Sequence, residues 1–293
     1  MRRTNERLQT ERGADIHLHR WQPAGGASRR LLVVHGLGEH GGRYGQLAKA
    51  AVARGWDVMA PDLRGHGGSS GRRGHVRRFD DYLDDLVDVL RRTADDNLPL
   101  AVLGHSMGGL IAARMVAAGR VEPAALALSS PLFGIAAPVG WFWRALGRAL
   151  NPTLPWASFN SGLNDDDATR DPVVLAARRN DPLTHRRVTA RWFCEITGVL
   201  KGVHGEASQI GLPLLVLQAG EDRMVCTEAS RRFFDLASSR DKQFRLFDEH
   251  YHELFGEITR EAIIQELLDW LEPRVTAKKL SAFSDRLSAS KFG

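Results

Sequence analysis

The length, composition and charge of the chain exclude several classes of protein. Its 293 residues, 43% of them hydrophobic, are enough for one large core or for one core with a smaller inserted module. Its two cysteines, Cys194 and Cys226, are too few for a disulfide framework and lack the spacing of a zinc finger. The formal net charge of +5 comes from basic residues scattered along the chain without a nucleic-acid-binding motif, so we expect no nucleic-acid partner.

Short apolar runs recur along the chain, each bounded by glycine, proline or aspartate. The early runs alternate with helical patterns, of which the clearest places Phe79, Leu83, Leu86 and Leu90 on one helical face. Runs that are apolar on both faces are typical of parallel strands covered by helices. We therefore predict an α/β fold with a mostly parallel central sheet and helices on both faces. The strand-like runs occupy residues 31–34, 58–60, 100–103, 125–128, 214–217 and 243–247.

The alternation of strands and helices is interrupted before the run at 214–217. The residues in this gap are interpreted as an inserted helical cap, rich in tryptophan and phenylalanine. Trp141, Phe142 and Trp143 open a short helix, and we expect them to bind substrate at an apolar entrance; the alternative is that they only pack the cap onto the core. The predicted units are a core of residues 1–130 and 210–274, a cap of residues 131–209 and a tail of residues 275–293.

Three segments bear on membranes and location. Residues 1–12 are charged, with no apolar stretch of a secretory signal behind them, which favours a cytoplasmic protein. Residues 124–143 carry no charge and could span a membrane, but their serines, prolines and glycines predict a strand, a loop and a new helix. The tail places apolar residues near one helical face among basic ones, so it either contacts a membrane surface peripherally or frays.

A glycine-flanked serine follows the apolar run at 100–103. The order Gly104, His105, Ser106, Met107, Gly108 leads directly into a helical stretch at residues 110–115. This strand, turn and helix is the context of a nucleophile elbow, in which small residues two positions either side of the serine prevent clashes in a strained turn. Ser106 is therefore the predicted nucleophile.

A serine nucleophile needs a general base and a carboxylate that orients the base. Asp222 follows the run at 214–217, where the carboxyl end of a parallel strand meets the catalytic edge of a sheet. We predict it as the carboxylate, ahead of Glu221 and Asp248. Both His250 and His252 lie in the loop before the last helix, and the pattern alone leaves the base open between them. No further ligand cluster supports a metal there, so we expect neither metal nor cofactor.

The tetrahedral intermediate of acyl transfer needs backbone N–H donors aimed at its oxyanion. One donor comes from the residue after the nucleophile, which is Met107. The second is expected from the glycine-rich loop at residues 35–40, which follows an early strand, and Leu37 is the predicted donor. This loop fits neither of the common phosphate-binding patterns.

Taken together, these motifs resemble the monoacylglycerol lipase and lysophospholipase family of α/β-hydrolases over residues 14–272. The resemblance implies an α/β-hydrolase fold with Ser106, Asp222 and His252 as catalytic triad, and it thereby favours His252 over His250. It also implies Leu37 as an oxyanion donor. The tail beyond Arg274 does not fit the family pattern. The matching segments are residues 35–44, 62–67, 104–109, 220–225 and 252–254, with similar cap segments at 169–172 and 181–185.

The predicted function is serine hydrolysis of carboxylic esters in lipids with a single acyl chain, either monoacylglycerols or lysophospholipids, through an acyl-enzyme intermediate. A small-ester carboxylesterase or an acyltransferase on the same fold would use the same residues. A non-catalytic ligand receptor would be expected to lack at least one member of the triad. The sequence leaves acyl-chain length, head group and oligomeric state open.

Overall fold

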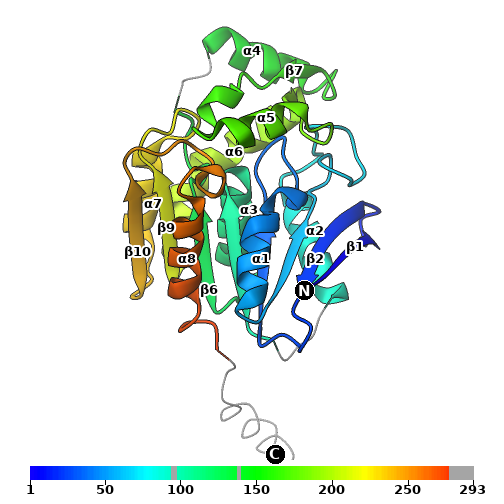
Figure 1. Cartoon of the computed structure of the whole chain (residues 1–293). Helices are drawn as coiled ribbons and strands as arrows, with labels where there is room; N and C mark the ends of the chain where they lie inside the picture. The colour runs from blue at the N-terminus through cyan, green and yellow to red at the C-terminus, as the bar shows by residue number, and fades with distance from the viewer. Residues whose placement is uncertain (94–97, 137–139, 277–293) are drawn as a thin grey trace, which may run out of the picture.

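An eight-stranded sheet forms the centre of the molecule (Figure 1). The computed structural model describes residues 1–93, 98–136 and 140–276, and the side chains of residues 141–144 are not described. The strand order is β1-β2-β4-β3-β5-β6-β9-β10, and all neighbours from β4 to β10 are parallel. The strands are β1 Arg2–Gln9, β2 Asp15–Gln22, β3 Arg29–Val34, β4 Trp56–Pro61, β5 Leu100–His105, β6 Ala125–Ser129, β9 Leu214–Ala219 and β10 Lys242–Phe247.

This architecture confirms the predicted α/β fold with a mostly parallel sheet. The runs at 31–34, 58–60, 100–103, 125–128, 214–217 and 243–247 all fall within strands of this sheet. The sequence analysis did not anticipate β1 and β2, which add an antiparallel hairpin to one edge. In β1 every second residue is exposed and no apolar run forms, so the strand lacks the pattern of a buried one.

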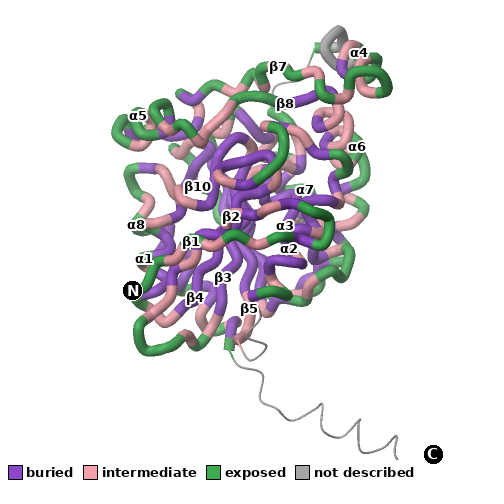
Figure 2. The backbone as a smooth tube through the Cα atoms, turned by 90° about the vertical axis from the view of Figure 1, so that its right-hand side faces the viewer, coloured by how far each residue is buried: buried purple, intermediate pink, exposed green. Residues whose placement is uncertain are grey.

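Helices cover both faces of the sheet, and alternate residues of each strand point into two separate cores. In β3, Leu32 and Val34 join the core on the face of α2, α3 and α7, whereas Leu31 and Val33 join the core on the face of α1 and α8. Figure 2 shows the inner strands as buried and many outer loops as exposed. The helices are α1 Gly45–Ala53, α2 Asp80–Arg92, α3 Met107–Ala117, α7 Thr227–Leu236 and α8 Arg260–Leu271.

The segment between β6 and β9 contributes no described strand to this sheet. It lies over the end of the sheet in Figure 1 and carries its own two-stranded antiparallel sheet, in which Phe159 pairs with Val188. We propose that residues 131–209 form the cap, although its last helix α6 also packs beside α3 and α7. Its elements are α4 Trp141–Leu150, β7 Ser158–Asn160, α5 Pro172–Asn180, β8 Arg187–Thr189 and α6 Ala190–Glu206.

The uncharged segment 124–143 is divided as the sequence predicted. Strand β6 ends at Ser129, and a new helix, α4, begins at Trp141. Within the described ranges, no helix combines the length and apolar character needed to cross a membrane. The tail beyond residue 276 lies outside the described residues, so its predicted contact with a membrane surface stays a prediction.

Candidate active site

Ser106 occupies the sharp turn between β5 and α3. Its backbone has φ of 53° and ψ of −120°, a conformation that non-glycine residues rarely adopt. Gly104 and Gly108 make this turn possible: a Cβ on Gly104 would lie 2.5 Å from the carbonyl oxygen of Gly108, and one on Gly108 would lie 2.1 Å from that of Val34. The strained turn and its two glycines match the geometry predicted for a nucleophile elbow.

His252 and Asp222 form a buried hydrogen-bonded pair. The distance between His252 Nδ1 and Asp222 Oδ2 is 2.7 Å, and the second carboxylate oxygen accepts the backbone N–H groups of Met224 and Val225 at 2.9 and 3.0 Å. Since a carboxylate can only accept, Nδ1 carries the proton and Nε2 of the neutral ring is free to act as a base. The ring of His252 lies 4.8 Å from that of His105, the residue before Ser106.

The charge of Asp222 sets the protonation of this pair. Burial is the largest influence on the pKa of His252 and lowers it, but the charge and hydrogen bond of Asp222, supported by Glu253 and Glu39, outweigh burial and hold this pKa above its ordinary value. Burial raises the pKa of Asp222, whereas the charge and hydrogen bond of His252 and two backbone N–H groups lower it further, so the carboxyl stays ionised at neutral pH.

The competing candidates are engaged elsewhere. His250 Nε2 lies 2.6 Å from Thr259 Oγ1 at an exposed position, and Glu221 pairs with Arg170 at 2.7 Å. The backbone of Asp248 packs against Gly220, where an added Cβ would lie 2.5 Å from the Asp248 carbonyl oxygen. The structure thus brings together the histidine and the carboxylate that the sequence analysis preferred, whereas His250 and Glu221 have other partners.

The predicted oxyanion loop runs alongside Ser106. A Cβ on Gly36 would lie 3.1 Å from Ser106 Cβ, so only glycine lets the backbone approach this closely. Leu37 and Ser106 line the same cavity, and Met107 begins α3. In the described part of the chain, neither the Leu37 nor the Met107 backbone N–H donates to another protein group. Both remain open to a ligand.

Glu39 holds this loop, a role that sequence analysis missed. Its Oε1 accepts the backbone N–H of Gly36 at 2.6 Å and the hydroxyl of Tyr44 at 3.0 Å. Burial would raise the pKa of Glu39, but the neighbouring His105, Arg43 and His35 and the Gly36 N–H together hold it below its ordinary range. The buried carboxylate therefore stays ionised, and its hydrogen bond with the Gly36 N–H fixes the turn of the loop.

Two arginines fix the residue after His252. Glu253 accepts from Arg43 at 2.6 Å and from Arg178 of α5 at 2.5 Å. Arg178 is itself buried and also donates to Asp165 at 3.0 Å. This arrangement, which we call the Glu253 clamp (Arg43, Glu253, Arg178), joins the histidine loop of the core to the cap. Because its members are far apart in sequence, no local pattern could have revealed it.

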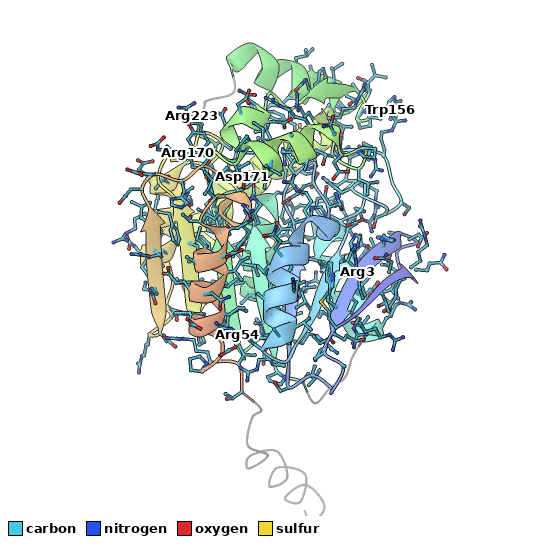
Figure 3. The ribbon with its side chains drawn as sticks, in the orientation of Figure 1. Arg3, Arg54, Trp156, Arg170, Asp171 and Arg223 are labelled. Carbon is cyan, nitrogen blue, oxygen red and sulfur yellow. The ribbon has the colours of Figure 1, made fainter. Side chains whose placement is uncertain are left out.

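Tyr251, the residue before His252, lies close to two further arginines. The guanidinium groups of Arg170 and Arg223 are 4.7 and 5.5 Å from the centre of its ring. Figure 3 labels these two arginines close to each other. Arg223 also pairs with Asp167 at 3.2 Å, and both side chains border the cavity that contains Ser106. Charged groups are therefore concentrated at this rim of the site.

A cavity of about 630 Å³ between cap and core contains Ser106. Most of its lining is apolar, and Phe159, Val188, Trp192, Phe193 and Ile196 come from the cap. Gly140, Leu146 and Gly147 place α4 at its edge. The side chains of the predicted substrate-binding residues Trp141, Phe142 and Trp143 lie outside the described residues, so their role stays a prediction.

The fold and the site define an α/β-hydrolase. The sequence pattern of the family described as serine aminopeptidase, S33, matches residues 26–259, and the chain belongs to this family. It is also similar to proteins named for lipid hydrolysis. Phospholipase YtpA of Bacillus subtilis is 34% identical over 238 residues, covering 80% of this chain and 92% of the relative.

Other relatives and solved structures agree with this assignment. The monoacylglycerol lipase of Mycolicibacterium smegmatis is 31% identical over 86% of this chain and 90% of its own length. The crystal structure of Paleococcus ferrophilus monoacylglycerol lipase superposes with a TM-score of 0.79 and 28% identity, covering 94% of this chain and all of that one. The chain is therefore a hydrolase of the α/β-hydrolase superfamily that is similar to monoacylglycerol lipases over most of its length.

Proposed function

We propose that this hydrolase cleaves the carboxylic ester of lipids with a single acyl chain, monoacylglycerols or lysophospholipids, through an acyl-enzyme on Ser106. The observation that carries the proposal is the largely apolar cavity of about 630 Å³ that opens on Ser106. A cavity of this size and character suits an extended hydrocarbon chain, with the ester held where polar groups meet the apolar lining. The names of the relatives, phospholipase and monoacylglycerol lipase, support the same substrate class.

The proposed reaction begins when His252 Nε2 takes the proton of Ser106 as the serine oxygen attacks the ester carbonyl. Asp222 holds the ring in the required tautomer and stabilises the imidazolium that forms. The backbone N–H groups of Leu37 and Met107 donate to the oxyanion of the tetrahedral intermediate. His252 then gives its proton to the departing glycerol oxygen, which leaves the acyl group on Ser106.

Deacylation repeats these steps with water as the nucleophile. His252 takes a proton from the water, the hydroxide oxygen attacks the acyl carbonyl, and the proton is returned to Ser106 as the fatty acid leaves. The Glu253 clamp (Arg43, Glu253, Arg178) keeps the histidine loop in place while His252 gains and loses its charge. An acyltransferase would differ only in the nucleophile that accepts the acyl group.

A substrate panel tests the proposal. Purified enzyme and Ser106→Ala are assayed on monoacylglycerols, lysophospholipids, p-nitrophenyl esters of graded chain length and an aminoacyl p-nitroanilide. We expect kcat/KM to rise with chain length on both lipid series, with no activity in the serine variant. A preference for acetate esters would favour a small-ester carboxylesterase, and turnover confined to the anilide would favour an aminopeptidase; either result would overturn the proposal.

The proposal includes contact with a lipid surface, because single-chain lipids gather in membranes and micelles. We expect the enzyme to bind vesicles reversibly through the edge of the cap around α4, which borders the cavity. Co-sedimentation with phosphatidylcholine vesicles measures this contact, and a variant with Leu146→Ser in the cap should sediment less than the wild type. Equal sedimentation of the two would place the lipid contact elsewhere on the chain.

A further inference from the structure

Two histidines and an aspartate gather beside the antiparallel hairpin, outside the catalytic site. His17 and His19 are alternate residues of β2 and point to the same face of the sheet. Asp62 follows β4, the strand next to β2, and its backbone N–H donates to the carbonyl oxygen of His17 at 2.8 Å. We call this set the β2–β4 cluster (His17, His19, Asp62).

The three side chains converge on one point. One ring nitrogen of each histidine and a carboxylate oxygen of Asp62 lie within 4.8 Å of one another. His19 Nε2 and Asp62 Oδ1 are 3.3 Å apart. In a tetrahedral zinc site with bonds near 2.1 Å, ligand atoms are separated by about 3.4 Å. Two of the three ligands already have this separation, and the ligand nitrogen of His17, the most exposed of the three residues, lies within 4.8 Å of both.

The hydrogen bonds of His19 leave a lone pair facing a carboxylate. Its Nδ1 lies 3.0 Å from the amide oxygen of Asn5, which can only accept, so Nδ1 carries the proton. In the neutral ring, Nε2 is then an acceptor that faces a second acceptor, Asp62 Oδ1. A proton on Nε2 would donate to Asp62 at this place, and a metal ion bound there would accept the lone pairs of both atoms. Among the described residues, His17 Nδ1 is buried without a hydrogen-bond partner, and His19 Nε2 is buried with Asp62 Oδ1 at 3.3 Å.

Two glycines make room for the cluster. A Cβ on Gly67, whose φ is +50°, would lie 2.1 Å from Asp62 Oδ2, and one on Gly68 would lie 3.0 Å from the ring of His17. The two oxygens of Asp62 accept the backbone N–H groups of Gly41 and Gly68, each at 2.7 Å, and these bonds fix the carboxylate in its orientation. Each oxygen retains a further lone pair for a ligand.

The neighbouring His40 is not a further ligand. Its ring lies 6.0 Å from that of His19, but its Nε2 is 2.7 Å from Asp181 of the cap and its Nδ1 accepts the backbone N–H of Gly42. The cluster itself therefore offers two imidazole nitrogens and one carboxylate oxygen, which leaves one position of a tetrahedral ion for water.

We propose that His17, His19 and Asp62 bind a divalent transition-metal ion of the zinc type. Two imidazoles and a carboxylate are a usual ligand set for Zn²⁺, whereas Mg²⁺ and Ca²⁺ prefer oxygen ligands alone. The ion is structural. It ties β2 to the loop after β4, and through the Gly41 N–H on Asp62 it supports the turn that continues the oxyanion loop. No step of ester hydrolysis passes through it.

Metal binding to the full-length chain without a histidine tag tests this site. The protein is dialysed against chelator and titrated with Zn²⁺ in a calorimeter, with thermal unfolding measured in parallel. We expect one equivalent to bind and to raise Tm. His17→Gln should weaken the affinity on the order of 10- to 100-fold or more, since loss of even an outer-shell partner of a metal ligand has an effect of that size. His75→Gln, a histidine outside the cluster, should bind like the wild type.

Two further measurements keep the result unambiguous. In the presence of chelator, His17→Gln should unfold at the same temperature as the wild type, which shows that the variant folds. Co²⁺ should give the visible absorption of a tetrahedral ion in the wild type alone. Absence of saturable binding, or equal binding by His17→Gln, would overturn the proposed metal site. A protonated His19 that donates to Asp62 would then account for their contact. Ester turnover of the metal-free enzyme is expected to be unchanged, so failure here is distinct from failure of the proposed lipase activity.

Discussion

The core and the cap hold their parts of the site by different means. In the core, the backbone positions these residues: Ser106 is fixed by a strained turn, and Asp222 accepts hydrogen bonds from two backbone N–H groups. The cap is attached to the core by charged side chains. Arg178 reaches Glu253, and His40 of the core pairs with Asp181 of the cap. The cap also provides much of the apolar lining of the cavity.

From this difference we infer that the core carries out the chemistry and that the cap sets the selectivity for the substrate. Changes in the core site should abolish turnover of every substrate, because the reacting groups are common to all esters. Changes in the cap should alter stability or the dependence on chain length and spare the chemistry. Five predictions test this division, and mixed outcomes would show that the two regions share both roles.

Ser106→Ala should have the largest effect. We expect kcat to fall on the order of 10⁶-fold and covalent labelling by a fluorophosphonate probe to disappear, because no other group can form the acyl-enzyme. The melting temperature should stay close to that of the wild type, since removing a hydroxyl from this turn leaves the core packing intact. Substantial turnover by the folded variant would contradict the proposed mechanism.

His252→Ala should cost nearly as much as the loss of the serine, because nucleophile and base act as a unit. The matched control is His250→Ala, two residues away, whose side chain bonds Thr259 at an exposed position. We expect the control to retain kcat within about threefold, as surface substitutions usually do. Steady-state kinetics on a soluble p-nitrophenyl ester compares the two, and the opposite ranking would reassign the base.

The pH profile tests the pairing of His252 with Asp222. The base must be neutral, so kcat/KM should rise with pH, and its midpoint should lie above the 6.5 of an ordinary imidazole because the pKa of His252 is raised. Asp222→Asn removes the charge that raises this pKa. The variant should therefore lose activity on the order of 10⁴-fold and show its midpoint at lower pH. If the midpoint of the pH profile does not move in this variant, Asp222 does not set the pKa of the titrating group.

The clamp is tested with two adjacent arginines of α5. Arg178→Met leaves buried carboxylates without one partner and should lower the free energy of unfolding by about 3 kcal/mol. Arg179→Met, which removes an exposed pair with Asp166, should cost less than about 1 kcal/mol. Thermal and urea unfolding measure both. Equal losses would show that the Glu253 clamp does not stabilise the junction of core and cap.

The smallest effect is expected from the aromatic residues that open α4. Each buried methylene contributes about 0.8 kcal/mol, so kcat/KM should climb several-fold per carbon until the cavity is full. Replacing Trp141, Phe142 and Trp143 together by Ser should flatten this climb for long chains and spare short esters. If acetate and long-chain esters lose activity equally, these residues support the fold alone and not substrate binding.

The sheet was predictable where strands are buried on both faces. Such strands are continuous apolar runs, as in residues 100–103 and 214–217, and the pattern is visible without knowledge of their neighbours. The edge hairpin was missed because β1 is exposed on alternate residues and β2 mixes histidines with apolar residues. The alternation of His17 and His19 was the one local signal of the cluster, and it was not recognised as such.

The sequence by itself determined the parallel sheet, and it predicted the nucleophile elbow and the order of the catalytic candidates, because each depends on residues a few positions apart along the chain. The choice between the two histidines needed either the family resemblance or the structure. Only the tertiary structure decided the Glu253 clamp, whose partners are 75 and 210 residues from Glu253, and the meeting of Asp62 with β2. The sequence around a charged side chain does not reveal a partner on another element. A buried arginine and an exposed one look the same in the sequence, and only the fold shows which of them meets a carboxylate.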